Sequence, residues 1–323
     1  MLIILAGVVL SLILCLSLPL NGFILFVFIK MHHTSKVQDA YIVSLAVSDF
    51  LQAMVGYPSE IRSLFTNDQQ EPNICRLTGF SVTFLGLVSI NHLVFLMIER
   101  ACVISMPFQT VWKSKKYVGS AIFASWVIGF ICAIAPLVGW SKYTAADAKY
   151  LCSINWEDKT EAGKAYVYFL FASQFILPLV LIFGCFGVIF FQLKKTAQRI
   201  ISSTSTSTTS TNENRNYTSK WTFMVSWMTA AYIISWTPYA VVSLITVSNG
   251  KSFILSEGVM MAVAITAKSS TLFNPVIYGL MYNDFRNKAK RLFRKWSTER
   301  EVKQSIQSNN KNCQRAVVKE IAI

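Results

Sequence analysis

The chain has 323 residues and a formal net charge of +14, yet 53% of its residues are hydrophobic and only 14% are charged. This composition is too apolar for a water-soluble domain of this length and favours a protein whose solvent is the membrane. The Lys and Arg residues lie between long apolar runs, which excludes the pattern of a nucleic-acid-binding protein.

Seven apolar segments are long enough to cross a membrane, for which a helix needs about 20 residues. They cover residues 2–29, 40–63, 76–103, 117–138, 165–193, 221–247 and 254–280. The first segment is too long for the apolar part of a signal peptide, so we expect it to be a helix of the protein itself. Four segments contain a proline, which packed membrane helices tolerate, at Pro58, Pro178, Pro238 and Pro275. The sequence therefore predicts an all-α membrane protein with a bundle of seven transmembrane helices.

The loops on the two sides of this bundle differ in charge. The loops after the first, third and fifth segments, counted with the adjoining segment ends and the C-terminal tail, hold 22 Lys and Arg residues, and the other loops with their segment ends hold seven. Basic loops stay on the cytoplasmic side of a membrane. We therefore expect a multi-pass protein of the cell membrane with its N-terminus outside and its C-terminus in the cytoplasm.

Two further stretches lie on the expected cytoplasmic side. The Ser- and Thr-rich run from Ser202 to Thr211 cannot pack a core, so we expect a mobile linker or a kinase target there. Residues 284–296 place apolar side chains near one helical face with Lys and Arg around it, which predicts a short helix lying on anionic membrane lipids. We expect a transmembrane domain over 1–296 and a disordered tail over 297–323.

Polar residues inside the segments are few, and their cost in lipid makes them candidates for function. They are Asn21, Asp49, Glu60, Asn91, Glu99, Arg100, Lys268 and Asn274. Glu60 lies eleven residues after Asp49, and eleven steps of about 100° return nearly to the same helix face. If Asp49 faces the interior of the bundle, we expect Glu60 to face it as well, about 16 Å nearer the outside.

The order of these residues and the motifs around them resemble the rhodopsin-like family of G-protein-coupled receptors, over about residues 20–296. The matching motifs are Leu45-Ala46-Val47-Ser48-Asp49, Glu99-Arg100-Ala101, Ser235-Trp236-Thr237-Pro238-Tyr239 and Asn274-Pro275-Val276-Ile277-Tyr278, with Cys75, Cys152, Trp126 and Pro178. Within that family, a Lys six residues before the Asn-Pro pair of the seventh helix is typical of opsins, and Lys268 is that residue. The chain is similar to opsins, most of all to cnidarian (jellyfish) opsins.

The resemblance implies that retinal, the 11-cis isomer in the dark, is held on Lys268 as a protonated Schiff base. The residues agree, because Lys268 is the sole charge in an apolar span, where an ammonium loses its hydration and the neutral nucleophilic amine is favoured. The alternatives are a Lys that reaches the membrane surface, which its central depth disfavours, and a Lys paired with a structural acid. The resemblance also implies a disulfide between Cys75 and Cys152. Around the chromophore it places residues that ordinary packing would explain one by one, namely Gly79, Thr83, Gly86, Phe175, Tyr232, Trp236 and Tyr239.

A protonated Schiff base in an apolar pocket needs an anion nearby. The two positions where better-known opsins carry this acid hold Thr78, three residues after Cys75, and Ala146, six residues before Cys152. Glu60 is the remaining carboxylate on the outer half of the membrane, and the second and seventh helices are neighbours in the family. We therefore expect Glu60 to be the counterion, with Asp147 or a bound anion or water network as the alternatives.

The resemblance further implies a light-activated receptor of phototransduction, not an enzyme. Its activation and coupling residues would be Asn21, Asp49, Glu99, Arg100, Asn274, Pro275 and Tyr278, with a sodium ion near Asp49 as one use of the polar cluster. The likeness to cnidarian opsins favours a stimulatory, cyclic-AMP-raising G protein, and arrestin and a receptor kinase are further expected partners.

Two departures concern the resting and active states: Ala101 replaces the usual Tyr, and Phe186 stands eight residues after Pro178, where a Tyr is common. The sixth-helix acid that usually pairs with the third helix is also missing, since Thr218 lies near its place. A retinal photoisomerase and a receptor for a diffusible ligand stay open as alternatives. A transporter or channel is disfavoured, because the sequence has no internal repeat and no row of pore charges.

Overall fold

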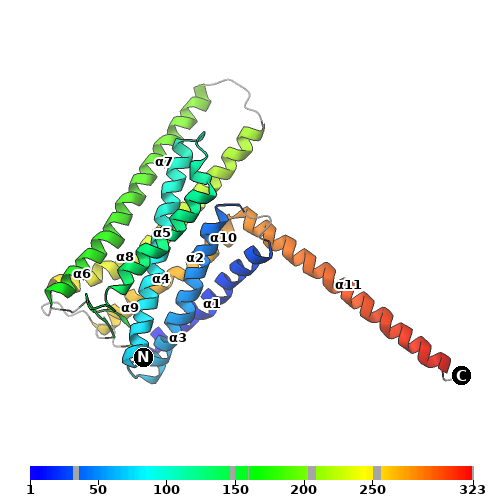
Figure 1. Ribbon diagram of the computed structural model, residues 1–323, viewed down its shortest axis with the longest axis horizontal. Coiled ribbons are helices and arrows are strands. Elements are labelled where there is room, and N and C mark those ends of the chain that lie inside the picture. The colour runs from blue at the N-terminus through cyan, green and yellow to red at the C-terminus, as the bar shows by residue number, and fades with distance from the viewer. Residues whose placement is uncertain are drawn as a thin grey trace.

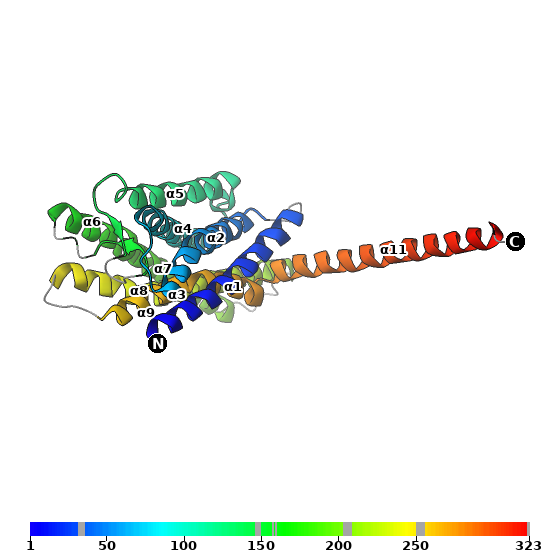
Figure 2. The ribbon, with the colours of Figure 1, turned by 90° about the horizontal axis from the view of Figure 1, so that it is seen from below.

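The computed structural model describes residues 1–31, 36–145, 150–156, 158, 160–202, 209–249 and 256–321. Helices run back and forth to form a bundle, and one long helix, α11, projects away from one end of it (Figures 1 and 2). The N-terminus lies at the opposite end of the bundle, the end that also holds the short strands β1 and β2.

The helices follow the predicted segments in order. The first span is α1 (Leu2–Lys30), the third is α4 (Pro72–Ser105), the fourth is α5 (Lys115–Ile134) after the short helix η3 (Val111–Lys113), and the sixth is α8 (Thr209–Asn249). The other spans are interrupted. The second consists of α2 (Asp39–Leu51), η2 (Gln52–Gly56) and α3 (Tyr57–Thr66), the fifth of α6 (Glu161–Phe171), η4 (Ala172–Ile176) and α7 (Leu177–Ser202), and the seventh of α9 (Glu257–Lys268) and α10 (Ser270–Met281). Within the described residues, six spans are long and apolar enough to cross a membrane as one helix, and the seventh is divided in two.

The interruptions in the second and fifth spans are π-helical turns that lie just before a proline. Pro58 and Pro178 each occupy the second position of the helix that follows the π-helical turn. A proline has no N–H for the helical hydrogen bond, and its ring collides with the carbonyl four residues earlier. A wider π-helical turn relieves this conflict. It also rotates the residues that follow, so that α3 is turned relative to α2.

The seventh span breaks at Ser269, between α9 and α10. Farther along, Pro275 cannot donate a hydrogen bond to the carbonyl of Thr271, four residues earlier. The side chain of Asn21 in α1 fills this place, since its Nδ2 donates to the Thr271 carbonyl oxygen at 3.0 Å. A buried polar side chain of the first span thus stabilises the irregular backbone of the seventh.

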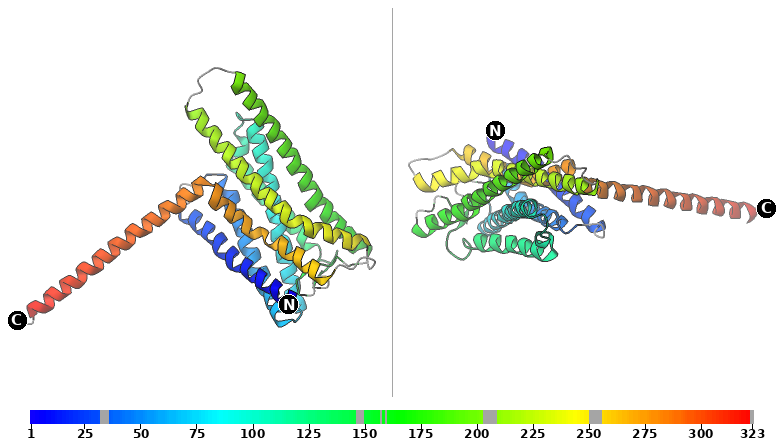
Figure 3. Two further views of the ribbon diagram at one scale, coloured as in Figure 1. Left: turned by 180° about the vertical axis from the view of Figure 1, so that it is seen from behind. Right: turned by 90° about the horizontal axis from the view of Figure 1, so that it is seen from above.

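The helix α4 runs through the middle of the bundle and packs against α2, α5, α7 and α8 (Figure 3). The outer face of the bundle carries many exposed aromatic and aliphatic side chains, among them Phe123, Phe190, Phe191 and Ile234. So much exposed apolar surface fits a protein whose outer face meets lipid.

The helix α11 (Asn283–Ile321) contains the short helix predicted over 284–296. Its first turns pack on α1, where Phe293 stacks on Phe23 and Trp296 meets Phe26, with ring centroids 5.9 and 5.3 Å apart. The helix continues to Ile321, where the sequence analysis predicted disorder. The stretch after 296 is rich in Glu, Lys, Gln and Arg, which favour helix, and Lys295 pairs with Glu299 one turn later at 3.9 Å.

The strands β1 (Tyr143–Thr144) and β2 (Ser153–Ile154) form an antiparallel hairpin, with Tyr143 opposite Ile154. A disulfide between Cys75 in α4 and Cys152 holds this hairpin against the bundle. The disulfide inferred from the resemblance is therefore present, and it fixes the loop that covers one end of the bundle.

Candidate functional site

The side chain of Lys268 lies at the break in the seventh span. Lys268 is the last residue of α9, and only 5% of its surface is exposed. Its backbone carbonyl accepts hydrogen bonds from the hydroxyl groups of Tyr57 at 3.0 Å and Thr271 at 3.1 Å. The amine is thus buried, and side chains of α3 and α10 hydrogen-bond to the backbone that carries it.

Glu60 in α3 faces this amine. Its side chain is fully buried, and its Oε1 lies 3.3 Å from Lys268 Nζ. Removing two charges from water costs more than a buried ion pair usually returns, so such a pair inside a membrane points to function. The two residues are close, as expected, and Glu60 therefore has the position that a counterion to Lys268 requires.

Of the other positions considered for the counterion, the structure describes only that of Thr78. Thr78 is uncharged and buried, and its hydroxyl lies 2.8 Å from that of Ser59 in α3. Ala146 and Asp147 lie outside the described residues, so the alternative at Asp147 stays a prediction.

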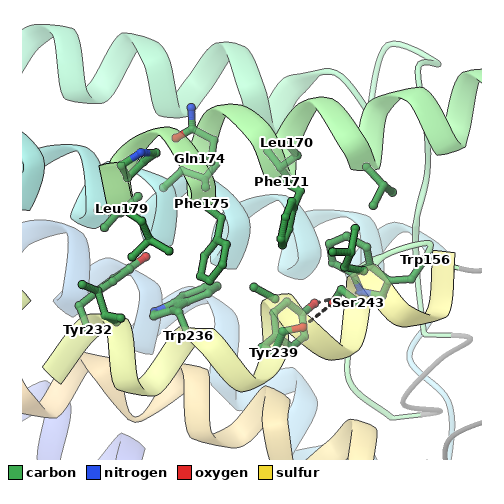
Figure 4. A pocket seen from close by; sticks show the side chains of 17 residues that line it. Trp156, Leu170, Phe171, Gln174, Phe175, Leu179, Tyr232, Trp236, Tyr239 and Ser243 are labelled. Atoms are coloured by element: carbon green, nitrogen blue, oxygen red, sulfur yellow. Dashed lines mark hydrogen bonds between the residues drawn. The ribbon is translucent and has the colours of Figure 1, made fainter. Parts of the chain in front are cut away.

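Two neighbouring cavities of about 100 and 80 Å³ share part of their walls. Lys268 lines the smaller one, together with Thr83 of α4 and residues of the hairpin around Cys152. Phe175 and Tyr232 line the larger one, between α7 and α8 (Figure 4). The walls that the cavities share are Leu87, Trp156, Leu170, Trp236 and Tyr239. Five of the seven predicted pocket residues therefore line these two cavities.

Gly79 and Gly86, the other two, are not among the described residues that line these cavities. A Cβ atom on Gly86 would lie 2.9 Å from the Trp236 ring, and one on Gly79 would lie 2.7 Å from the Tyr143 ring. Both glycines therefore let an aromatic side chain approach α4 closely, and their place around the chromophore stays a prediction.

Tyr143 and Trp156 bring the hairpin region into the site, and the sequence analysis missed both. The Tyr143 hydroxyl donates to the Ala133 carbonyl at 2.7 Å, and burial raises the pKa of this phenol above its ordinary value, so it remains a donor. Trp156 Nε1 donates to the Tyr239 hydroxyl at 3.2 Å (Figure 4). The closeness of Trp156 to Cys152 in the sequence was the one available indication.

A polar cluster surrounds Asp49 deeper in the bundle. Asp49 accepts hydrogen bonds from Asn274 Nδ2 at 2.9 Å and from the Ser89 hydroxyl at 3.2 Å. The expected cluster therefore joins Asp49 to Asn274, whereas Asn21 bonds to the backbone of Thr271. A sodium ion near Asp49 stays a prediction.

Arg100 lies near the end of the bundle from which α11 projects. It forms a buried ion pair with the neighbouring Glu99. Its guanidinium also lies over the ring of Trp221 in α8, 5.7 Å from the centroid, and Trp221 packs edge-on against Tyr282 at 4.9 Å. Trp221 thus bridges Arg100 and Tyr282. Tyr278 of the predicted motif is also fully buried.

Tyr282 is held in turn by a buried acid. Its hydroxyl donates to Asp39 at the start of α2, and Asp39 also pairs with Lys288 of α11 at 2.5 Å. The sequence analysis missed four residues here, which are Trp221, Tyr282, Asp39 and Lys288. In the sequence, Asp39 and Lys288 resemble ordinary loop and surface charges. Thr218 lies in α8 one turn before Trp221, and its side chain is outside the described part.

Comparisons with known proteins agree with this geometry. Residues 20–278 match the family described as 7 transmembrane receptor (rhodopsin family). The chain is 31% identical over 277 residues to green-sensitive opsin-3 of Psalidodon fasciatus, covering 84% of this chain and 75% of that protein. It is 28% identical over 271 residues to melanopsin-B of Xenopus laevis, covering 82% of this chain and 50% of that protein.

A solved structure shows the same fold. The crystal structure of squid rhodopsin matches with a TM-score of 0.80 and 22% sequence identity, covering 90% of this chain and 85% of that chain. The chain belongs to the rhodopsin family of seven-transmembrane receptors and, within it, to the opsins. Membership implies a multi-pass membrane photoreceptor with a retinal chromophore that couples to a heterotrimeric G protein, a receptor and not an enzyme. The likeness to cnidarian opsins stays a prediction.

Proposed function

We propose that this opsin binds retinal covalently through Lys268, as a protonated Schiff base whose counterion is Glu60, and activates a G protein in response to light. The observation that carries the proposal is the buried pair of Lys268 Nζ and Glu60 Oε1, 3.3 Å apart at the wall of an apolar cavity. An unpaired amine there would be costly in lipid, and the carboxylate offsets that cost.

The cavities fit a long apolar ligand that begins at Lys268. Their walls are mostly aromatic and aliphatic, and Trp236 and Tyr239 belong to both, so a ligand that starts in one can continue into the other. Retinal, when bound, supplies the absorption of light and a change of shape, and we propose the 11-cis isomer for the dark state. Glu60 would hold the proton at Nζ, and the ring of Trp236 would sense the shape of the ligand.

Signalling would use the end of the bundle that carries Arg100. We propose that this end is cytoplasmic and the N-terminus extracellular, in keeping with the excess of Lys and Arg in its loops. Pro238 lies within α8 and lacks a helical hydrogen bond, so α8 can bend there and uncover Arg100 for a G-protein helix. We propose a stimulatory G protein, with arrestin and a receptor kinase as further partners.

Reconstitution with 11-cis-retinal tests the proposal. The protein is expected to give a visible absorption band, and Lys268→Ala is expected to abolish it, with Lys288→Ala as a control for loss of another buried Lys. A protein without pigment, or an undiminished band in Lys268→Ala, would overturn the proposal.

Coupling is tested in cells that express the protein with 11-cis-retinal. We expect light to raise cyclic AMP, and the same cells are monitored for calcium and for inhibition of cyclic AMP. A pigment that forms normally but changes none of these signals would instead favour a retinal photoisomerase.

A further inference from the structure

Tyr57 makes two separate contacts with Lys268. Tyr57 is the first residue of α3, directly after the π-helical turn η2, and its side chain is fully buried. Its hydroxyl donates to the backbone carbonyl of Lys268 at 3.0 Å, and the centroid of its ring lies 6.0 Å from Lys268 Nζ. One side chain therefore contacts both the backbone and the amine of the same residue.

The first contact stabilises the break in the seventh span. In an uninterrupted helix the carbonyl of Lys268 would accept from the N–H of Leu272, four residues later. Here the N–H of Leu272 donates to the carbonyl of Ser269 at 3.0 Å instead. The hydroxyl groups of Tyr57 and Thr271 donate to the carbonyl of Lys268 in its place, and Tyr57 is the donor that comes from another span.

The second contact adds to the electrostatic field around the amine. The face of an aromatic ring is negative and attracts a cation within about 6 Å of its centroid, most strongly where water is excluded. Glu60 follows Tyr57 by three residues in α3, so both side chains lie on one face of the helix. A single turn of α3 thus presents a carboxylate and an aromatic ring to Lys268.

We propose that Tyr57 is a positioning residue for Lys268, whose hydroxyl fixes the backbone that carries the amine and whose ring shares with Glu60 the stabilisation of positive charge at Nζ. The proposal rests on the proposed function, in which Lys268 carries retinal. It assigns different consequences to the hydroxyl and to the ring, and these can be separated.

The ring is expected to influence the colour of the pigment. Negative potential near the nitrogen holds the positive charge there and opposes its spread along the conjugated chain. A weaker potential lets the charge spread, which moves absorption to longer wavelengths. Removing the negative ring face should therefore shift the absorption maximum to the red, while removing the hydroxyl alone should leave it nearly unchanged.

The test uses the full-length protein reconstituted with 11-cis-retinal. Tyr57→Phe keeps the ring, and phenylalanines with increasing ring fluorination at position 57 keep its shape while they weaken its negative face. We expect the absorption maximum of Tyr57→Phe to match the unmodified protein and that of the fluorinated proteins to move stepwise to the red. Tyr57→Leu, which removes the ring, is expected to shift in the same direction and provides a second variant.

The hydroxyl is tested by the rate at which hydroxylamine bleaches the pigment in the dark. Loss of a buried hydrogen bond of about 1 kcal/mol predicts a roughly fivefold faster reaction in Tyr57→Phe. Tyr41→Phe is the matched control, because Tyr41 is also fully buried but lies in α2, away from Lys268. Melting temperatures of the retinal-free proteins report whether each variant folds.

Superimposable spectra of the fluorinated and Phe proteins, or equal bleaching of Tyr57→Phe and Tyr41→Phe, would overturn the assignment of Tyr57. These results differ from a failure of the proposed function, in which the unmodified protein would form no pigment or Lys268→Ala would form one.

Discussion

Lys268 Nζ lies 3.3 Å from Glu60 Oε1, and both side chains are buried. This pair joins the second and seventh spans in the half of the bundle that the hairpin covers. The acid paired with the amine lies in α3, whereas the uncharged Thr78 stands at the α4 position where better-known opsins carry their acid.

Glu60→Gln is therefore expected to remove the negative partner of the bound chromophore. The visible band should be lost at neutral pH and replaced by ultraviolet absorption, because the proton at Nζ loses its compensating charge. Glu60→Asp should keep part of the visible band. The measurement is the absorption spectrum of the reconstituted protein.

Glu71→Gln is the control for this substitution, because Glu71 is exposed at the start of α4. An unchanged visible band in Glu60→Gln would contradict the assignment. If Asp147→Asn or removal of chloride then abolished the band, the counterion would be Asp147 or a bound anion.

Trp221→Ala is expected to raise signalling in the dark. The ring of Trp221 in α8 contacts Arg100 of α4 and Tyr282, the residue before α11. These contacts would hold the resting state in place of the ion pair that a sixth-helix acid usually makes. A cation–π contact of about 0.5–2 kcal/mol corresponds to a roughly two- to thirtyfold shift toward the open state. Basal cyclic AMP in cells measures the effect.

Trp227→Ala serves as the comparison, since Trp227 lies in the same helix but is 53% exposed on the outer face. Equal basal signalling in the two variants would show that Trp221 does not hold the resting state.

Cys152→Ser is expected to destabilise the protein by about 2–5 kcal/mol through loss of the disulfide with Cys75. The hairpin would no longer be fixed over the cavity that contains Lys268. The thermal half-life of the pigment measures this change. Cys15→Ser removes an exposed free thiol and should leave the half-life unchanged.

Asn21→Ala is expected to lower stability by about 1–3 kcal/mol, because the Thr271 carbonyl loses its donor at the place where Pro275 cannot supply one. The melting temperature of the purified protein in detergent measures the loss. Ser11→Ala is the control, since the Ser11 hydroxyl bonds only within its own helix, to Gly7. A melting temperature equal to that of the control would contradict this role.

The sequence alone determined the seven spans and marked Lys268 as a candidate for function. These follow from local properties, because apolar length predicts a span and a lone charge in lipid is too costly to be incidental. The family motifs then added the disulfide partners, which the structure confirmed, and the opsin resemblance, which the comparisons confirmed.

The tertiary structure decided how side chains from distant segments meet. The sequence argument for Glu60 assumed regular helix from Asp49 onward, but η2 rotates α3, so the 3.3 Å distance to Lys268 depends on how the second and seventh spans pack. Tyr57 and Trp221 contact residues far away in the chain, and nothing in their local sequence indicates those partners. Helix periodicity fixes a face only until a π-helical turn or a break changes it, and the contacts beyond that point come from packing.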